Sequence, residues 1–494
     1  MDYISTRSIN CPKISSAEAI KTGLSPDGGL YMPEHIPTLT NEELASLYDM
    51  SYPERAAKIL AKFLTDYTEE ELLADTAAAY APERFSAAPA PVTALSDLFI
   101  LELFHGPTCA FKDMALQLMP RLFSRALIKC KEEKTALILT ATSGDTGKAA
   151  LEGYRDIPGV RLQVFYPTDG VSTLQKLQMQ TQEGKNLSVI AIRGNFDDAQ
   201  NGVKAIFSDP AMKAELDKRG VFLSSANSIN FGRLAPQIVY YISAYCDLVK
   251  NGSIAEGEVI DVAVPTGNFG NIFAAFLAKK MGLPIGTLLC ASNRNHVLTD
   301  FLESGVYDRN RPFFQTISPS MDILISSNLE RLLYLIAGPE RTAAYMKNLA
   351  EHGAYRLTPE DFAEVRRHFV GMYTDEEETE RTVRETYEKQ NYLTDPHTAV
   401  ALCAARRYEK IRKAERKMLV VSTASPYKFA KTVTHALTGN TPPDGIEAAD
   451  RLHTLTGREI PAPLDALRRA TIRFSEVIEA PDMPKTVLHF AENQ

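Results

Sequence analysis

Four short segments of this sequence combine side chains and backbone groups that can do chemistry. They are His105–Asp113 (HGPTCAFKD), Thr142–Gly147 (TSGDTG), Gly267–Asn271 (GNFGN) and Ser422–Pro426 (STASP). Each follows a short apolar run that predicts a buried strand, and a predicted helix begins soon after each of them. In open α/β sheets, ligands bind where strand ends meet helix N-termini, so the four segments are interpreted together.

The segment Gly267–Asn271 has the features of a phosphate cradle. Its two glycines let backbone N–H groups approach an anion closely, and the helix that follows adds its positive N-terminal dipole. The spacing does not match the dinucleotide fingerprint G-x-G-x-x-G. A simple tight turn between a strand and a helix would have the same residues, and spacing alone leaves both interpretations open.

The segment Thr142–Gly147 superficially resembles a nucleotide-binding P-loop because Lys148 follows it. The P-loop pattern G-x-x-x-x-G-K-[ST] fails at two fixed positions: Thr142 stands where the first glycine belongs, and Ala149 stands where the magnesium-binding hydroxyl belongs. This mismatch argues against an ATPase or a GTPase. A hydroxyl-rich turn at a helix start remains, and such a turn suits the binding of a carboxylate.

The other two segments offer an amine and a hydroxyl. Lys112 lies among Cys109, Ala110 and Phe111. It could be a surface lysine whose stem covers apolar neighbours, or a desolvated amine of lowered pKa that forms a Schiff base with an aldehyde cofactor. A hydroxyl of Ser422–Pro426 could cap a helix or hydrogen-bond a ring nitrogen.

The elements that must position these segments alternate between apolar strands and helices. This alternation predicts an α/β architecture, with parallel strands covered by helices on both faces. The predicted strands are Leu98–Phe104, Ala136–Ala141, Leu162–Tyr166, Val189–Ile192, Val259–Val264 and Met418–Val421.

The chain divides at a Pro/Ala-rich stretch, Ser86–Pro91, which separates residues 1–95 from residues 96–494. Thr40 and Thr68 each begin a helix with an acidic first turn in the N-terminal part. Residues 328–390 are predicted to form a helical insertion, with Thr358-Pro359 as one helix start and the acidic run 375–378 as a solvated start. The tail from Gly439 is a further addition.

Composition excludes several classes of protein. The 494 residues are 45% hydrophobic and 23% charged with a net charge of −8, which argues against wholesale disorder and gives no strongly basic footprint for nucleic acid. No apolar run reaches membrane-helix length, and no secretory signal is visible. The six cysteines form no CxxC pair or zinc-finger spacing, so we expect no metal site and reduced thiols in a cytoplasmic protein.

These segments, with several others, occur in the order found in the threonine synthase family, which the sequence resembles over nearly its whole length. The longer bacterial and fungal branch is the most similar, because it has a separate N-terminal domain and an aspartate at the position of Asp145. The shared motifs are STR at 5–7, SPDGGLYMP at 25–33, HGPTCAFKD at 105–113, SGDTG at 143–147, NSIN at 227–230 with Arg233, PTGNFGN at 265–271, SPSMDI at 318–323, DPHTA at 395–399 and STASP at 422–426.

The resemblance implies a fold of two open, mostly parallel sheets with helices on both faces, similar to tryptophan synthase β, plus a small α+β N-terminal domain. The smaller of two lobes would span roughly 135–240. It also implies the cofactor pyridoxal 5′-phosphate, the substrate O-phospho-L-homoserine, and the products L-threonine and phosphate. The protein is then expected to bind neither nucleic acid nor membrane and to be a monomer or a homodimer.

The same resemblance implies roles for individual residues. Lys112 would be the Schiff-base lysine, and Thr423 would face the pyridine nitrogen. Gly267, Asn268, Phe269, Gly270 and Asn271 would surround the cofactor phosphate. Ser143, Gly144, Asp145 and Thr146 would bind the amino-acid carboxylate, while Asn227, Ser228, Asn230 and Arg233 would bind the substrate phosphate. His397 is interpreted as a structural first-turn residue, and His105 is left without a role.

Two alternatives remain at this point. One is a serine or threonine dehydratase, or another pyridoxal-phosphate β-replacement enzyme. Such an enzyme needs no second anion site, so the segment from Asn227 to Arg233 favours the phosphorylated substrate. The other is a non-catalytic paralogue that binds a cofactor or metabolite. Such a protein would be expected to lose parts of the site, whereas Lys112, the Gly267–Asn271 loop and Thr423 are all present.

Overall fold

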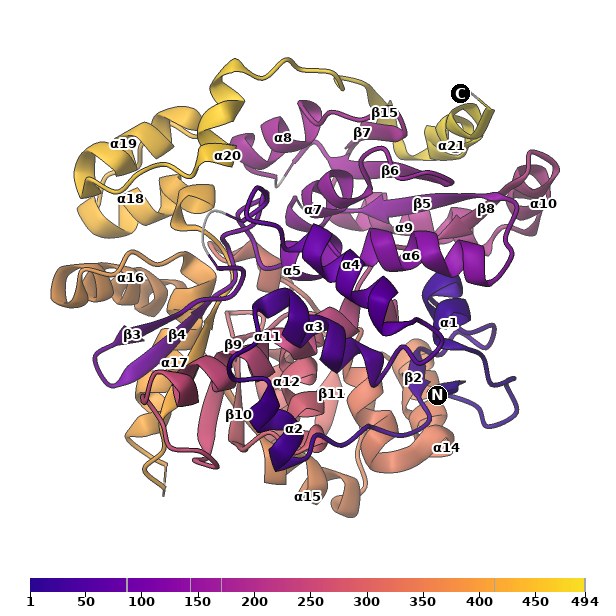
Figure 1. Cartoon of the computed structure of the whole chain (residues 1–494). Coiled ribbons are helices and arrows are strands. Elements are labelled where there is room, and N and C mark those ends of the chain that lie inside the picture. The colour runs from indigo at the N-terminus through magenta and orange to yellow at the C-terminus, as the bar shows by residue number, and fades with distance from the viewer. Residues whose placement is uncertain (86–87, 143, 170, 413, 493–494) are drawn as a thin grey trace.

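The computed structural model describes residues 1–85, 88–142, 144–169, 171–412 and 414–492, and two open sheets form its centre (Figure 1). In both sheets all neighbouring strands are parallel, except that β3 runs antiparallel to β4. The larger sheet has the order β13 (Phe369–Tyr373), β10 (Ile285–Ser292), β9 (Ile260–Pro265), β14 (Met418–Ser422), β4 (Leu98–Glu102) and β3 (Val92–Leu95). The smaller sheet has the order β15 (Val477–Glu479), β7 (Leu187–Arg193), β6 (Val160–Pro167), β5 (Thr135–Ala141) and β8 (Val221–Ser224).

The predicted class, α/β with two open and mostly parallel sheets, is confirmed. All six strands predicted from apolar runs are present, within one or two residues of the expected bounds. Every residue of β9 and β14 is buried, as expected for central strands of a sheet with helices on both faces. These two strands pair in parallel, so the loops that follow them emerge at the same edge.

Helices cover the sheets and connect the strands. Around the smaller sheet lie α6 (Met119–Lys129), α7 (Asp145–Tyr154), α8 (Thr173–Gln180), α9 (Phe196–Ser208) and α10 (Pro210–Lys218). Around the larger sheet lie α12 (Gly270–Met281), α13 (Val297–Ser304), α15 (Pro359–His368), α16 (Glu376–Gln390), α17 (Pro396–Glu409) and α18 (Ala430–Thr438). The short α5 (Asp113–Leu116) begins directly after Lys112.

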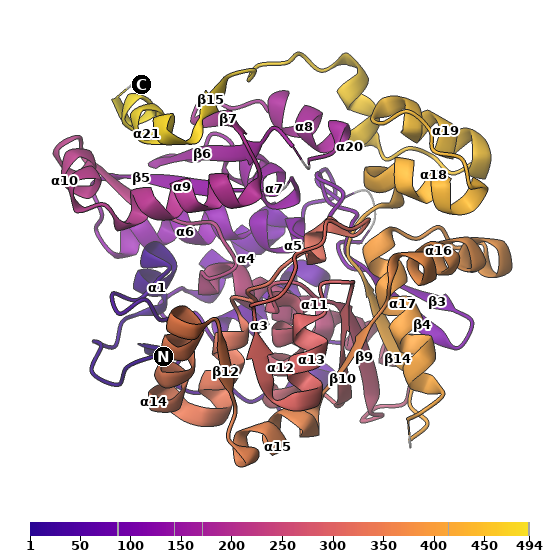
Figure 2. The same ribbon diagram turned by 180° about the vertical axis from the view of Figure 1, so that it is seen from behind.

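One long helix, α11 (Phe231–Lys250), is buried on nearly all sides. It contacts α12 beside the larger sheet, α5 and α6 towards the smaller sheet, and α3 (Tyr52–Ala61) of the N-terminal part (Figure 2). A helix that is apolar all round belongs in a protein interior, and this sequence has that composition. α11 therefore contacts helices of both lobes and of the N-terminal segment.

The N-terminal part is a small α+β unit. It contains β1 (Tyr3–Ser5), α1 (Ser16–Thr22), β2 (Tyr31–Pro33), α2 (Asn41–Ser46), α3 (Tyr52–Ala61) and α4 (Glu69–Ala79). Thr40 and Thr68 begin α2 and α4, and both first turns are acidic, as predicted; each start also forms a capping box. The unit is packed against the core through aromatic contacts, such as that of Tyr3 with Phe231, whose ring centroids are 5.0 Å apart.

Two segments that the sequence predicts to be additions to the core also contribute strands to the two sheets. Residues 328–390 form α14 (Leu329–His352), α15 and α16, but also β12 (Ala354–Arg356) and β13, which is an edge strand of the larger sheet. Thr358 caps α15 and Asp375 caps α16, as expected. After α19 (Ile446–Thr456) and α20 (Ala462–Asp465), the tail crosses the smaller lobe, where β15 pairs with β7 and α21 (Met483–Glu492) covers α9 and α10 (Figures 1 and 2). The limits of the domains stay predictions.

Within the described ranges, no helix is both long enough and apolar enough to cross a membrane. All six cysteines are free thiols.

Candidate active site

The predicted segments meet between the two lobes. The strand-end loops at residues 105–113 and 422–426 are hydrogen-bonded to each other, because Phe111 N–H donates to the Thr423 carbonyl oxygen at 2.8 Å and Ala110 forms a β-bridge with Ala424. Lys112, on the first of these loops, reaches Asp145 at the start of α7 in the smaller lobe. The site therefore combines residues from the carboxyl ends of strands in both sheets, as the topology requires.

Lys112 is a buried amine. Its side chain is about 10% exposed, and its Nζ lies 3.3 Å from Asp145 Oδ2 and 3.5 Å from Ser320 Oγ. Burial lowers the pKa of Lys112; the Asp145 carboxylate opposes this shift, whereas the positive charges of Arg233 and Lys428 add to it. The surface-lysine interpretation does not hold, and an amine in this environment is suited to act as a nucleophile.

Asp145 is an ionised carboxylate held by two ammonium groups. Its Oδ1 accepts hydrogen bonds from Gln175 Nε2 at 2.9 Å and lies 2.7 Å from Lys428 Nζ, while Oδ2 faces Lys112. Burial alone would raise the pKa of Asp145, but the charges of Lys428 and Lys112 hold it well below its usual range. A negative side chain repels a carboxylate. The groups of this loop that can bind a ligand carboxylate are therefore its backbone amides.

Among the described residues, the backbone of this loop leaves two amides for a ligand. Thr142 Oγ1 accepts the N–H groups of Gly144 at 3.0 Å and Gly147 at 2.9 Å, and the amides of Asp145 and Thr146 remain at the open first turn of α7. Gly144 has φ +135°, and an added Cβ would lie 2.6 Å from the Gln175 side chain, so glycine is required here. The predicted residue Ser143 lies outside the described residues.

The Gly267–Asn271 loop has the form of an anion cradle. Its carbonyl groups are bonded outward: Ser326 Oγ donates to the Gly267 oxygen at 2.8 Å, and Asn328 N–H donates to the Asn268 oxygen at 3.1 Å. Phe269 is buried in the left-handed conformation with φ +60°, which turns the chain into α12. The first-turn amides of α12 have no partners within the helix, so they are free to bind an anion together with the helix dipole.

Two further features of this cradle fit a bound phosphate. A Cβ on Gly267 would lie 2.8 Å from the Ser320 carbonyl oxygen, which explains why this position is glycine. Asn271 is buried, and its Oδ1 accepts hydrogen bonds from the hydroxyls of Tyr240 and Tyr241. Its Nδ2 has no partner among the described residues. A buried donor without a partner is costly, and a ligand oxygen would satisfy it.

Thr423 is fixed by its backbone and has a free hydroxyl. Its N–H donates to Thr398 Oγ1 at 3.3 Å and its carbonyl oxygen accepts from Phe111, while the residue as a whole is buried. Within the described part of the chain, its hydroxyl has no hydrogen-bond partner. This is the arrangement that a partner for a cofactor ring nitrogen needs.

The segment from Asn227 to Arg233 joins β8 to α11. Arg233 is buried, and its Nη1 donates to the Ala226 carbonyl oxygen at 3.0 Å. Burial lowers the pKa of Arg233 to about 10, and the guanidinium forms no ion pair with any carboxylate of the described residues. A buried and unpaired cation is strongly unfavourable unless an anion joins it.

The other residues predicted for this second anion site differ in how much of their polar surface is free. Asn227 and Ser228 are half-buried, and Ser228 Oγ lies 3.5 Å from Ser327 Oγ. Asn230 is fully buried and caps α11: its Oδ1 accepts from Gly232 N–H at 2.9 Å, and its Nδ2 donates to the Ile20 carbonyl oxygen at 2.7 Å. Asn230 therefore fixes the helix start that carries Arg233.

Family comparisons agree with this arrangement along the chain. The model of the threonine synthase N terminus matches residues 2–80, that of pyridoxal-phosphate-dependent enzymes matches 87–424, and that of the threonine synthase C-terminal region matches 398–482. The chain belongs to the threonine synthase family. The predicted cofactor, pyridoxal phosphate, is confirmed at the level of this enzyme class, and the described loops fit it.

Individual members of the threonine synthase family are similar over most of the chain. Threonine synthase of Pseudomonas aeruginosa is 40% identical, over 91% of this chain and 93% of that protein. Human threonine synthase-like 1 is 41% identical over 88% of this chain, which spans only 60% of the human protein. The crystal structure of pyridoxal-phosphate-bound threonine synthase from Brucella melitensis has a TM-score of 0.87 and 35% identity, covering all of both chains. The yeast threonine synthase structure has a TM-score of 0.88 and 33% identity, covering all of this chain and 98% of that one.

Sequence reasoning missed three residues of the site, although two of them lie in or beside motifs that threonine synthases share. Ser320 belongs to SPSMDI, and Lys428 lies two residues after STASP. Gln175 is the N3 residue of the capping box of α8, and nothing local indicates that its amide also reaches Asp145.

His397, which the sequence analysis interprets as a structural residue, holds Ser320 in place. Ser320 N–H donates to His397 Nε2 at 3.1 Å, so Nε2 is unprotonated and the ring proton is on Nδ1, which faces Asp395 Oδ1 at 2.8 Å. The expectation of a structural role for His397 agrees with this geometry, since its effect on the site passes through Ser320.

Proposed function

We propose that the protein is a threonine synthase, which converts O-phospho-L-homoserine and water into L-threonine and inorganic phosphate with pyridoxal phosphate. One observation carries the proposal: the buried Lys112 amine lies near two separate sites that call for anions, the amide cradle at the start of α12 and the unpaired Arg233. A phosphorylated cofactor and a phosphorylated substrate need one site each. The similar threonine synthases from bacteria and yeast support the same assignment.

The cofactor site would consist of three parts. Lys112 would hold the cofactor covalently, the amides of Gly267–Asn271 with Asn271 Nδ2 would bind its phosphate, and the Thr423 hydroxyl would face its ring nitrogen. When bound, pyridoxal phosphate supplies an electron-withdrawing ring that stabilises negative charge on the substrate carbons. A threonine hydroxyl enforces a charged ring nitrogen less strongly than a carboxylate would.

The substrate would be held at both of its ends. Arg233 offers a planar, two-pronged donor to the substrate phosphate, with Asn227 and Ser228 beside it. The amides of Asp145 and Thr146 would bind the amino-acid carboxylate at the start of α7. Holding both ends places the carbons between them against Lys112. Proton transfer between these carbons and the amine then occurs within one bound complex.

Lys112 would then move the protons of the reaction. Freed by the incoming substrate, its amine removes the Cα proton and afterwards a Cβ proton, and Arg233 takes up the phosphate that departs from Cγ. One of these protons returns to Cγ, the hydroxyl of water adds at Cβ, and the other proton returns to Cα, while the remaining proton of water goes to the released phosphate. Lys112 finally displaces threonine. Burial lowers the pKa of the Lys112 amine, which makes it easier for Lys112 to lose its proton and act as a base.

The first experiment is to incubate the purified protein with O-phospho-L-homoserine and to quantify both products. We expect threonine and phosphate in equal amounts and no comparable turnover of serine or free threonine. Lys112→Ala should abolish turnover, and borohydride reduction of the wild-type protein should leave a pyridoxyl group on Lys112. A dehydratase would instead release ammonia from serine or threonine, and product formation by Lys112→Ala would remove the catalytic assignment.

A further inference from the structure

Lys428 is a second fully buried lysine in the site, and nothing in the proposed reaction uses it. It belongs to the 3-10 turn η2 (Pro426–Phe429), which follows β14 in the larger lobe. Its side chain is 0% exposed. Its Nζ lies 2.7 Å from Asp145 Oδ1 and donates to the Thr108 carbonyl oxygen at 2.9 Å. The ammonium therefore has two fixed acceptors, one in each lobe.

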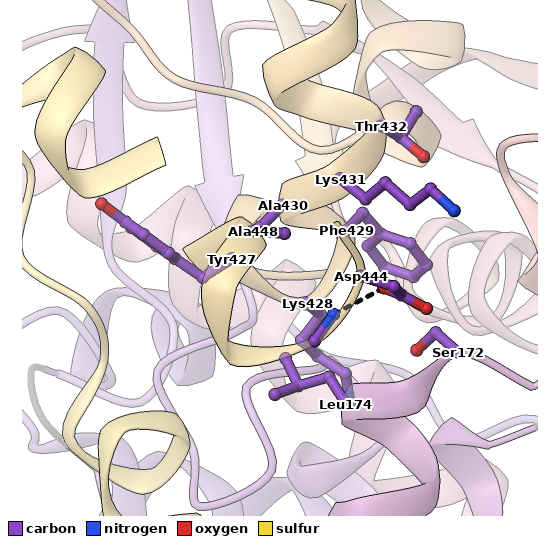
Figure 3. Close-up of a pocket in the computed structure, with 11 residues that line it drawn as sticks. Ser172, Leu174, Tyr427, Lys428, Phe429, Ala430, Lys431, Thr432, Asp444 and Ala448 are labelled. Atoms are coloured by element: carbon purple, nitrogen blue, oxygen red, sulfur yellow. Dashed lines mark hydrogen bonds between the residues drawn. The ribbon is translucent and has the colours of Figure 1, made fainter. Parts of the chain in front are cut away.

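The backbone around Lys428 is held firmly. Ser425 caps the turn by accepting the Tyr427 N–H at 3.3 Å, and Ser425 N–H donates to the Cys109 carbonyl oxygen at 3.0 Å. Phe429 packs edge-on against His397, with ring centroids 4.8 Å apart. Figure 3 shows the pocket beside this turn, where Ser172 and Leu174 of the smaller lobe lie next to Lys428 and Phe429.

Asp145 is a single carboxylate with two lysine side chains beside it. This one carboxylate faces two ammonium groups, and Lys428 is the closer of the two at 2.7 Å, against 3.3 Å for Lys112. If Lys112 were its only partner, the ion pair would favour the protonated form of Lys112, which is not a nucleophile. Lys428 supplies the positive charge that Asp145 needs, and it also repels a proton on Lys112.

We infer that Lys428 is a positioning residue: it holds the Asp145 carboxylate across the two lobes and thereby weakens the ion pair between Asp145 and Lys112. This inference rests on the proposed role of Lys112 as the cofactor lysine. It assigns the buried cation a purpose in the reaction without contact to the reacting atoms, because Lys428 acts on Lys112 both through Asp145 and through the repulsion between their two charges.

Other charged groups around the pair do not replace Lys428. Arg233, from α11, also acts on Lys112, and as a further cation it works in the same direction as Lys428. Lys148, on α7, is paired with Glu152 at 3.3 Å. Asp113, on α5, accepts both the N–H and the hydroxyl of Thr108 at 2.8 Å. From α17, His397 faces the turn with its ring, and its two nitrogens are occupied by Ser320 and Asp395.

The test measures the visible absorbance of the cofactor in the holoenzyme as a function of pH. This absorbance reports protonation of the nitrogen that joins Lys112 to the cofactor, and its midpoint is the pH at which half of that nitrogen is protonated. In Lys428→Met, Asp145 keeps only Lys112 as a cationic partner, so we expect the midpoint to rise by about one to two pH units. Lys428→Arg keeps the charge and should leave the midpoint within roughly 0.3 units. Asp145→Asn removes the anion and should lower the midpoint.

Lys431→Met is the matched control. Lys431 lies three residues further along the same pocket (Figure 3), but it is exposed, so solvent screens its charge and the midpoint should not move. Circular dichroism verifies the fold of every variant. If Lys428→Met alone does not fold, the double variant Lys428→Met/Asp145→Asn removes the whole pair, and its midpoint should lie about one unit above that of Asp145→Asn.

An unchanged midpoint in folded Lys428→Met, or in the double variant relative to Asp145→Asn, would overturn the inference. Peptide mass spectrometry after borohydride reduction separates this failure from failure of the proposed function. A pyridoxyl group on Lys112 with an unmoved midpoint removes only the role of Lys428. A pyridoxyl group on another lysine of the wild-type protein removes the cofactor assignment itself.

Discussion

The buried side chains of this site derive their chemistry from what surrounds them. Lys112 and Arg233 are both cationic residue types, yet burial shifts the pKa of each downward, and only Lys112 has a carboxylate beside it. The amine can give up its proton and react, whereas the guanidinium stays charged at neutral pH. One residue is therefore suited to covalent chemistry and the other to binding an anion.

Arg233 can be tested by removing its charge. In Arg233→Met we expect kcat/KM for O-phospho-L-homoserine to fall by about 10- to 100-fold, because the substrate phosphate loses charged hydrogen bonds worth about 1.5–3 kcal/mol. The variant should retain its cofactor and should lose only the stability of one hydrogen bond, about 1 kcal/mol, because Arg233 donates to the Ala226 carbonyl oxygen and forms no ion pair with the described residues. Steady-state kinetics and thermal melts measure both effects.

The matched control is Arg219→Met, which removes an arginine on the outside of the same lobe, paired there with Glu215 and Glu492. This change should leave the kinetics unaltered. Equal losses in the two variants, or loss of the cofactor from Arg233→Met, would contradict an anion site at Arg233.

The position of the first turn of α12 depends on how the Gly267–Asn271 loop packs against the loop that contains Ser320. Gly267 lies so close to the Ser320 carbonyl group that only a glycine fits, and His397 fixes Ser320 from the opposite side. The loop cannot retreat without moving Ser320, whose hydroxyl lies against Lys112. The cradle and the amine are thus held in register by loop packing.

Gly267→Ala tests this arrangement. An added Cβ would lie 2.8 Å from the Ser320 oxygen, so the loop must shift and its amides lose their alignment. We expect pyridoxal phosphate to bind at least about 10-fold more weakly, the loss of one good hydrogen bond, as measured by fluorescence titration. Lys280→Ala, at the exposed far end of α12, is the control, and equal cofactor affinity in both variants would argue against the cradle.

At the scale of the whole molecule, the C-terminal segment completes the sheet and the core of the smaller lobe. β15 adds an edge strand to the smaller sheet, and α21 buries Met483 and Val487 against that lobe. Met483 lies so near Gly202 of α9 that a Cβ there would overlap the Met483 sulfur. The last helix therefore belongs to the core of the smaller lobe, although the chain reaches it after passing through the larger one.

Met483→Ala tests how much the packing of α21 stabilises the folded protein. Removing a fully buried side chain should lower the free energy of unfolding by about 2–5 kcal/mol, through lost burial and the cavity that remains. Val477→Ala, on the exposed face of β15, should change it by less than about 0.5 kcal/mol. Urea denaturation gives both values, and a neutral Met483→Ala would mean that α21 contributes no core.

Some strands could not be predicted from the sequence. The buried central strands β9 and β14 are continuous apolar runs and were predicted almost to the residue. β15 is short and mostly exposed, so it has no apolar signal, and it exists because β7 offers an unpaired edge. β13 likewise forms because β10 lies beside it, in a region where helical periodicity dominates.

The order of the motifs determined, by itself, the family, the cofactor class and the identities of the loops. Those properties depend on local chemistry, such as glycines at a helix start or a lysine after an apolar strand, and local chemistry is written in consecutive residues. The tertiary structure alone decided which distant groups share Asp145, how His397 reaches Ser320 and where the chain's last helix packs. Hydrogen bonds, burial and charge act over a few ångströms in space, and the chain brings Lys112, Asp145 and Lys428 within that range only when both lobes have folded.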